Sequence, residues 1–98
     1  MFGFDVERAA IEHAREVAPL ESCGFVIAGQ YVRQENIHQD PQNHFTIARE
    51  EWVKAWQSGS KVEAVIHSHT GQHGQFPSAN DMEGQMRTNI PWGIVSLR

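Results

Sequence analysis

The sequence predicts an α/β fold in which helices flank a mixed β-sheet. Three observations support this prediction: an amphipathic helical pattern over residues 5–18, a continuous apolar run over residues 62–66, and an alternation of helical and strand-like segments along the chain. The predicted order is α-β-β-α-β-α-β, which is typical of a sheet with helices packed against it. With 98 residues, the chain is expected to form one domain over residues 1–98.

The first helix is predicted over residues 5–18. Asp5 is suited to its N-cap, apolar side chains recur at helical spacing along one face, and charged side chains take the other face. Pro19 ends the helix, because proline cannot continue the hydrogen-bonded ladder. His13 falls on the apolar side, and we interpret it as a half-buried packing residue rather than a ligand.

A β-hairpin is predicted next. Residues 25–28 are rich in β-forming side chains, Gly29 and Gln30 mark a turn, and residues 31–34 can return as the second strand. Residues 36–43 are polar and contain a proline, so we expect a loop there. Residues 45–47 are expected to be a short extended piece or the start of the next helix.

The second helix is predicted over residues 48–58, and Gly59 is a suitable residue to end it. The central strand is predicted over residues 62–69. Its apolar residues Ala64, Val65 and Ile66 are continuous rather than alternating, which is expected for a strand covered on both faces.

The last part of the chain is predicted as a loop, a helix and a strand. Residues 70–76 hold glycines and glutamines, a third helix runs from Ser78 to about Met86, and residues 92–97 form the last strand. The sequence stops directly after this core-like strand, so we expect the chain to be one piece of a longer protein.

Composition excludes several classes of function. The net charge of −4, with no cluster of Lys or Arg, argues against a nucleic-acid partner. The single cysteine, Cys23, cannot form a disulfide within the chain, so a reducing compartment such as the cytoplasm is expected. No secretory segment and no long apolar run is present, so we predict neither export nor a membrane span. The sequence gives no indication of oligomeric state.

Two histidines at the end of the central strand are the strongest chemical signal. His67 and His69 are two residues apart, so in an extended strand both imidazoles point to one face and can reach one metal ion. The carboxyl end of a central strand is also where α/β sheets place their sites. Asp81 could complete a three-ligand site that leaves zinc a fourth position for water.

Other readings of the neighbouring residues stay open. Ser78 with Asp81 three residues later is also a pattern for starting a helix, and that role is compatible with metal binding. Glu21 alone would be an ordinary surface carboxylate, but a metal-activated water needs a base, and Glu21 could supply it. Cys23 is more often a small core residue than a nucleophile.

Together these residues resemble the JAMM motif of the JAB/MPN+ zinc metallopeptidases. The match consists of Glu21, the run His67-Ser68-His69, and Ser78 with Asp81. Residues 21–29 also look like the first strand of that family, and residues 91–96 look like its closing strand, particularly in phage and prophage tail-assembly proteins. The resemblance implies the JAB/MPN, cytidine-deaminase-like architecture.

The resemblance also implies a mechanism. A Zn²⁺ ion would be held by His67, His69 and Asp81 with water in the fourth position, Glu21 would be the general acid and base, and Ser78 would stabilise the oxyanion. Family members hydrolyse peptide or isopeptide bonds, often next to the C-terminus of a ubiquitin-like protein. A tail-assembly version would act on a tail protein in the cytoplasm of the bacterial host.

Two departures from the family pattern support an alternative. Thr70 stands where the family usually has proline, and the spacer over residues 70–77 is one residue longer than usual. The alternative is a non-catalytic scaffold or binding module with the same fold. A further alternative is a cysteine hydrolase in which Cys23 is the nucleophile and a histidine is its base.

Overall fold

The computed structural model describes residues 3–59, 61–70 and 79–97, and within them it confirms the predicted order of elements. The helices and strands are α1 Phe4–Val17, β1 Cys23–Ile27, β2 Gln30–Gln34, α2 Arg49–Gln57, β3 Val62–His69, α3 Ala79–Thr88 and β4 Trp92–Ser96.

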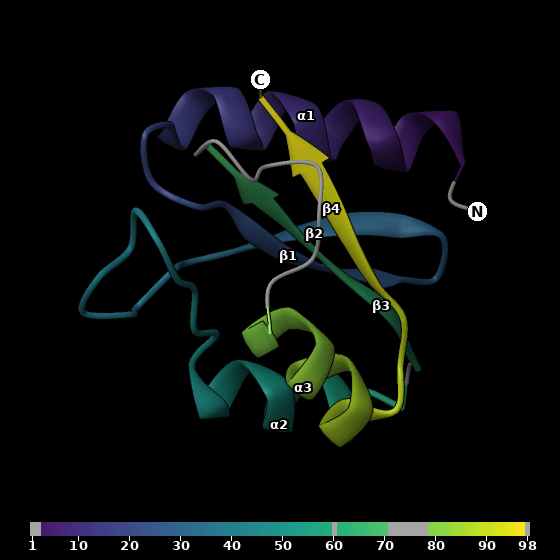
Figure 1. Ribbon diagram of the computed structural model, residues 1–98. Coiled ribbons are helices and arrows are strands. Elements are labelled where there is room, and N and C mark those ends of the chain that lie inside the picture. The colour runs from purple at the N-terminus through teal and green to yellow at the C-terminus, as the bar shows by residue number, and fades with distance from the viewer. Residues whose placement is uncertain (1–2, 60, 71–78, 98) are drawn as a thin grey trace.

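The strands form one mixed sheet in the order β2-β1-β3-β4 (Figure 1). Strand β1 is antiparallel to both β2 and β3, whereas β3 and β4 are parallel and are connected through α3. Antiparallel neighbours can be joined by a tight turn, whereas parallel neighbours need a longer crossover that is usually helical. The prediction of a mixed sheet with flanking helices is therefore confirmed.

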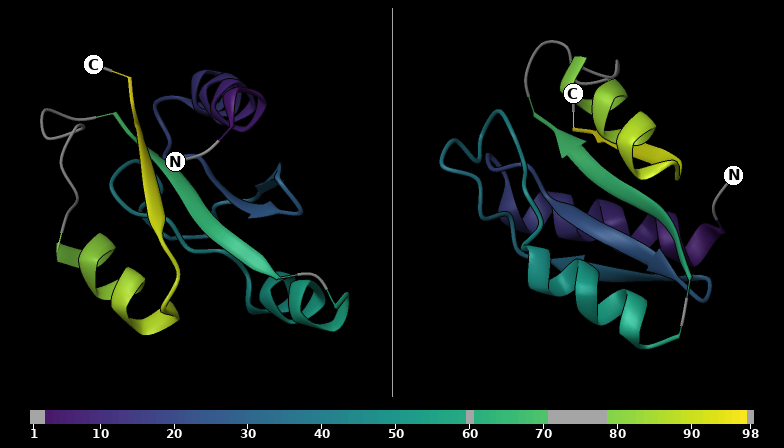
Figure 2. Two further views of the ribbon diagram at one scale, coloured as in Figure 1. Left: turned by 90° about the vertical axis from the view of Figure 1, so that its right-hand side faces the viewer. Right: turned by 90° about the horizontal axis from the view of Figure 1, so that it is seen from below.

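Helix α1 covers one face of the sheet, and α2 and α3 lie on the other (Figure 2). Successive side chains of β3 alternate between these faces, so Ala64 and Ile66 pack toward α1 while Val65 and His67 point the other way. Because both faces are covered, the continuous apolar run of β3 is explained.

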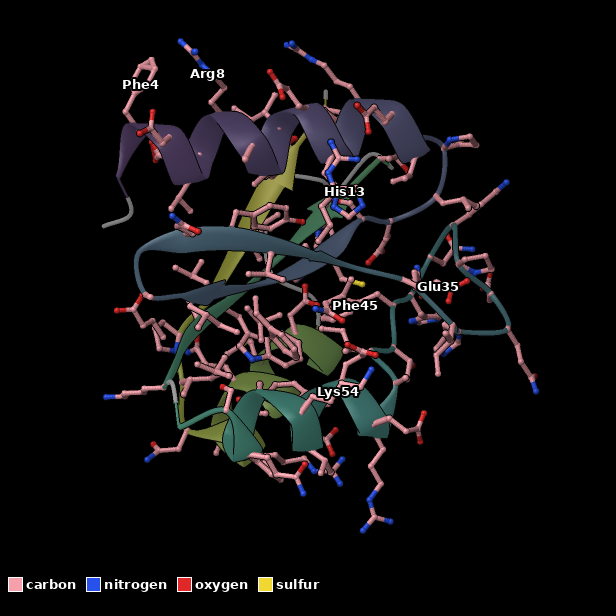
Figure 3. All side chains as sticks on the ribbon, turned by 180° about the vertical axis from the view of Figure 1, so that it is seen from behind. Phe4, Arg8, His13, Glu35, Phe45 and Lys54 are labelled. Atoms are coloured by element: carbon pink, nitrogen blue, oxygen red, sulfur yellow. The ribbon has the colours of Figure 1, made fainter. Side chains whose placement is uncertain are left out.

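Two predictions about α1 are wrong in detail. The helix begins at Phe4 with Gly3 as N-cap, so Asp5 lies in the first turn, where its charge favours the helix dipole without capping it. His13 is buried rather than half-buried, at 5% exposure, and points from α1 toward the sheet (Figure 3). Its Nδ1 lies 2.7 Å from the hydroxyl of Tyr31. The Tyr31 ring crosses Gly24 so closely that a Cβ there would lie 2.4 Å from it.

The second half of the chain also differs at some boundaries. Residues 45–47 form neither strand nor helix. Helix α3 continues to Thr88, two residues beyond the prediction, and ends where Asn89 takes a φ of 56°. It packs closely on β4, because a Cβ at Gly84 would lie 2.0 Å from the Trp92 ring. Among the described ranges, no helix has the length and apolarity that crossing a bilayer demands.

Candidate metal centre

The site is built around His67 at the end of β3. Its side chain is fully buried on the face that α2 and α3 cover. The Phe45 ring stacks on the imidazole at a centroid distance of 4.6 Å and an angle of 24°, and the Trp92 ring meets it edge-on at 5.9 Å. These two aromatic rings keep water away from His67 and hold the imidazole in one orientation.

Asp81 faces both histidines. It lies in the first turn of α3 and is 6% exposed. Its Oδ1 is 3.1 Å from Nε2 of His67, and its Oδ2 is 2.9 Å from Nε2 of His69. The structure thus brings together the three side chains predicted as metal ligands. A single carboxylate that faces two imidazole nitrogens marks the place where a cation would bind.

Glu21 approaches the other ring nitrogen of His67. It is 7% exposed, and its Oε1 lies 3.6 Å from Nδ1 of His67. The neighbouring Ser22 holds the segment against β3, because its N–H donates to Oγ of Ser68 at 2.7 Å and its carbonyl accepts the N–H of Ser68 at 3.1 Å. Strand pairing continues this alignment, since Cys23 lies opposite His67.

The geometry of these side chains fits a metal ion. One ligand atom each from Glu21, His67 and His69 lies within 4.8 Å of the others. Both ring nitrogens of His67 are buried, and neither has a hydrogen-bond partner among the described residues. A buried polar group normally has such a partner, so a metal ion bound at one ring nitrogen would give that nitrogen a partner, while a carboxylate faces each of the two nitrogens. The group formed by Glu21, His67 and His69 could therefore hold a metal ion.

The charges around His67 favour a cation as well. Burial lowers the pKa of His67, but the carboxylates of Asp81 and Glu21 outweigh burial and raise the pKa above its ordinary value. The same two carboxylates that favour a proton on the ring favour a metal ion beside it, because buried carboxylates need a compensating positive charge.

Ser78 and Thr70 also bear on the predicted site. Ser78 lies outside the described residues, so its role as an oxyanion donor stays a prediction. Thr70, where the family usually has proline, donates its hydroxyl to the carbonyl of Pro19 at 3.2 Å. This bond ties the end of β3 to the segment just before Glu21.

Cys23 has the properties of a core residue. It is fully buried, and its Sγ points to the carbonyl of Gln34 at 3.8 Å. Burial, with the nearby charge of Glu21, raises the pKa of the Cys23 thiol to about 12. A nucleophilic cysteine needs the thiolate form, so this environment argues against the cysteine-hydrolase alternative.

A cleft of about 280 Å³ opens next to the site. Glu21 and Asp81 contribute to its wall, together with Arg87 of α3 and residues from the loop before α2. A larger groove of about 560 Å³ lies between α1 and β4 and is lined by other residues. The smaller cleft is therefore the one that reaches the candidate metal centre.

Sequence reasoning missed the aromatic rings of Phe45 and Trp92 and the amide of Asn36. The rings gave no signal, because apolar residues near a strand are most simply read as core. Asn36 offered a weak signal, because an asparagine in a polar loop often accepts the backbone N–H two residues later. In the structure its side chain accepts the N–H of His38 in this way.

Comparison with known proteins defines the class to which the chain belongs. The family model for prokaryotic homologs of the JAB domain matches residues 5–96, nearly the whole chain. The chain belongs to this family, and the resemblance of its motif to the JAB/MPN+ pattern is confirmed.

One curated relative and one solved structure are similar to the chain. Over 92 residues it is 34% identical to tail tip assembly protein K of Escherichia phage N15, covering 90% of this chain but only 37% of that protein. It also matches the solution structure of protein DSY2949 from Desulfitobacterium hafniense, with a TM-score of 0.72 and 24% identity. That match covers 98% of this chain and 73% of the other, and it shows a shared fold.

Proposed function

We propose that this chain is a zinc-dependent hydrolase of peptide or isopeptide bonds. The observation that carries the proposal is the convergence of Glu21, His67, His69 and Asp81 in one buried cluster beside a cleft. Membership of the JAB family supports it, because the same residues fill the JAMM pattern in order.

In the proposed site the two histidines and Asp81 hold the zinc ion. When bound, zinc supplies a Lewis acid that polarises the scissile carbonyl and activates a water molecule. Glu21 takes the proton of the attacking water and delivers it to the leaving nitrogen. Ser78 is proposed to stabilise the developing oxyanion with its hydroxyl. Phe45 and Trp92 exclude water around His67, which strengthens the electrostatic contribution of the charged side chains.

The geometry also supports a second set of three ligands, which consists of Glu21, His67 and His69. Glu21 is near enough to both histidines to serve as the third ligand in place of Asp81. The isosteric variants Glu21→Gln and Asp81→Asn separate the two sets. If Asp81 is the ligand, D81N loses zinc, while E21Q keeps about one zinc per chain and loses hydrolysis.

The proposed biological setting is tail assembly of a phage or prophage, in the cytoplasm of the bacterial host. Similarity to tail tip assembly protein K supports this setting, although the chain spans about a third of that protein's length. The proposed substrate is a protein or peptide, with the C-terminal region of a tail protein or of a ubiquitin-like protein as the candidate.

The test combines metal analysis with cleavage of an internally quenched peptide library and of a matched isopeptide set. We expect cleavage that o-phenanthroline abolishes, that zinc restores and that iodoacetamide leaves unchanged. E21Q that cleaves as fast as the wild type would refute the role of Glu21 as base. A wild-type chain that holds no zinc and cleaves nothing would instead be a scaffold or binding module.

A further inference from the structure

The amide nitrogen of Asn36 lies within hydrogen-bond distance of three backbone carbonyl oxygens. Its Nδ2 lies 2.9 Å from the carbonyl oxygen of His44, 3.0 Å from that of Glu21 and 3.3 Å from that of Pro41. Two of these partners belong to the loop before α2, whereas Glu21 belongs to the candidate metal centre. One side chain therefore connects the loop to the proposed base.

The amide oxygen of Asn36 is also fully used. Its Oδ1 accepts the N–H groups of His38 and Thr46, each at 3.1 Å. An amide side chain offers two donor hydrogens on nitrogen and two acceptor positions on oxygen. A flipped amide would set its oxygen against carbonyl oxygens, so only one orientation satisfies these partners.

Hydrogen bonds from this loop hold the backbone of Glu21 on both sides. Its carbonyl accepts from Asn36, and its N–H donates to the carbonyl of Pro41 at 2.7 Å. Glu21 precedes β1 and takes no part in the pairing of β1 with β2 and β3. Strand β3 holds the neighbouring Ser22 through Ser68, whereas both hydrogen bonds to the Glu21 backbone come from the loop. The same loop carries Phe45, the ring that stacks on His67.

We propose that Asn36 is a positioning residue, which sets the Glu21 carboxylate in place beside His67. This inference rests on the proposed function for its catalytic consequence. Loss of the Asn36 amide would shift the proposed base while leaving the histidines and Asp81 in place. A displacement of about 1 Å can cost on the order of a hundredfold in rate.

The variant that tests this is Asn36→Asp, with Asn36→Ala beside it. N36D keeps the shape of the side chain but removes both donors and sets a carboxylate oxygen against the carbonyl groups. Gln39→Glu is the matched control, because it makes the same change of charge on an exposed side chain of the same loop. Each protein is measured for zinc affinity by calorimetry with zinc chloride, for peptide hydrolysis, and for amide exchange by NMR without metal.

In N36D we expect the Glu21 amide to exchange at least about tenfold faster, because the side chain no longer donates to the carbonyls of Glu21 and Pro41, and the bond from the Glu21 N–H to Pro41 opens more easily. The Thr46 amide should change little, because Asp keeps an oxygen that accepts its N–H. We expect kcat to fall about 10- to 100-fold, with KM and zinc affinity within about threefold of the wild type. For kcat and for the Glu21 amide, N36A should change in the same direction but less, because water can replace part of the lost amide. The Thr46 amide should exchange faster in N36A, because its acceptor is removed. Q39E should match the wild type in all three measurements.

A folded N36D with wild-type kcat would overturn the proposal, even if its amides exchange faster, because Asn36 would then be structural only. If N36D does not fold, N36A decides by the same criteria. If the wild-type chain cleaves no peptide, the proposed function fails, and amide exchange still tests the hold on Glu21. Unchanged exchange of the Glu21 amide in N36D would then overturn the positioning role.

Discussion

Two buried histidines lie on opposite faces of the sheet, and their surroundings differ. His13 on α1 is 5% exposed, and its Nδ1 has the hydroxyl of Tyr31 as partner at 2.7 Å. His67 on β3 is completely buried, and neither ring nitrogen has a hydrogen-bond partner in the described part of the chain. Instead, two carboxylates, Glu21 and Asp81, face its ring nitrogens.

The two pKa values move in opposite directions for this reason. Burial lowers the pKa of His13, the positive charge of Arg33 lowers it further, and Glu16 opposes both. For His67, burial also lowers the pKa, but the carboxylates of Asp81 and Glu21 outweigh it and raise the pKa. Burial alone thus does not distinguish a packing histidine from one that could hold a metal ion. The charge and geometry of the partners do.

The largest expected difference between the two histidines is in metal content. His67→Ala should hold almost no zinc after dialysis against metal-free buffer, because a ligand is removed. His13→Ala should keep about one zinc per chain, like the wild type. Mass spectrometry of the metal in purified protein gives the answer. Full zinc content in a folded H67A would remove His67 from the proposed site.

Zinc should also stabilise the wild-type chain. With free zinc about a thousandfold above its Kd, the free energy of unfolding should rise by about 4 kcal/mol. H13A should gain the same amount from a lower starting stability, whereas H67A should gain nothing. Urea titrations with and without zinc measure this. A zinc gain in H67A equal to that of the wild type would show that the ion binds elsewhere.

The aromatic partners of the histidines allow a finer test. Tyr31→Phe removes the hydrogen bond to His13 and should cost about 0.5–1.5 kcal/mol of stability. Phe45→Leu removes the ring that stacks on His67 and should cost about the same. Only F45L should weaken zinc binding, because only Phe45 orients a proposed ligand. Equal zinc affinity in both variants, measured by calorimetry, would remove that role from Phe45.

The smallest expected effect is the pH dependence of stability that His13 contributes. Its folded-state pKa lies below the ordinary value of 6.5, so the unfolded chain binds the proton more readily. The contribution of neutral His13 is therefore complete above about pH 6.5 and is lost as the pH falls toward the lower folded-state pKa. Arg33 of β2 and Glu16 of α1 are the charged groups that act on this ring.

His13→Gln should remove this part of the pH dependence. Unfolding of both proteins by urea between pH 5 and 8, with chelator present, isolates the effect from metal binding. The wild type should lose stability relative to H13Q as the solution becomes more acidic. Parallel curves for the two proteins would contradict the lowered pKa.

The sequence predicted those parts of the molecule that depend on local pattern. The bounds of β3, Val62–His69, match the prediction because a continuous apolar run ends at two polar imidazoles. The spacing of His67 and His69 put both rings on one face for the same local reason. Their meeting with Asp81 depends on where α3 lies on the sheet, which spacing alone does not determine. The resemblance to the family supplied that link.

Long-range contacts explain what the sequence could not predict. Asn36 binds a carbonyl 15 residues earlier in the chain, and His13 finds its partner 18 residues later. Neither distance leaves a periodic pattern. The start of α1 was misplaced because an acidic residue suits both the N-cap and the first turn, and the choice between them depends on backbone geometry.

The close approach of α3 to β4 has a consequence for the metal centre. Gly84 lies one turn after Asp81 on the same side of the helix, and the ring of Trp92 occupies the space that a side chain at Gly84 would need. A methyl group there would act as a wedge that lifts the helix from the strand. The position of the Asp81 carboxylate relative to the two histidines thus depends on Gly84, because only a residue without a side chain lets α3 pack this closely on Trp92.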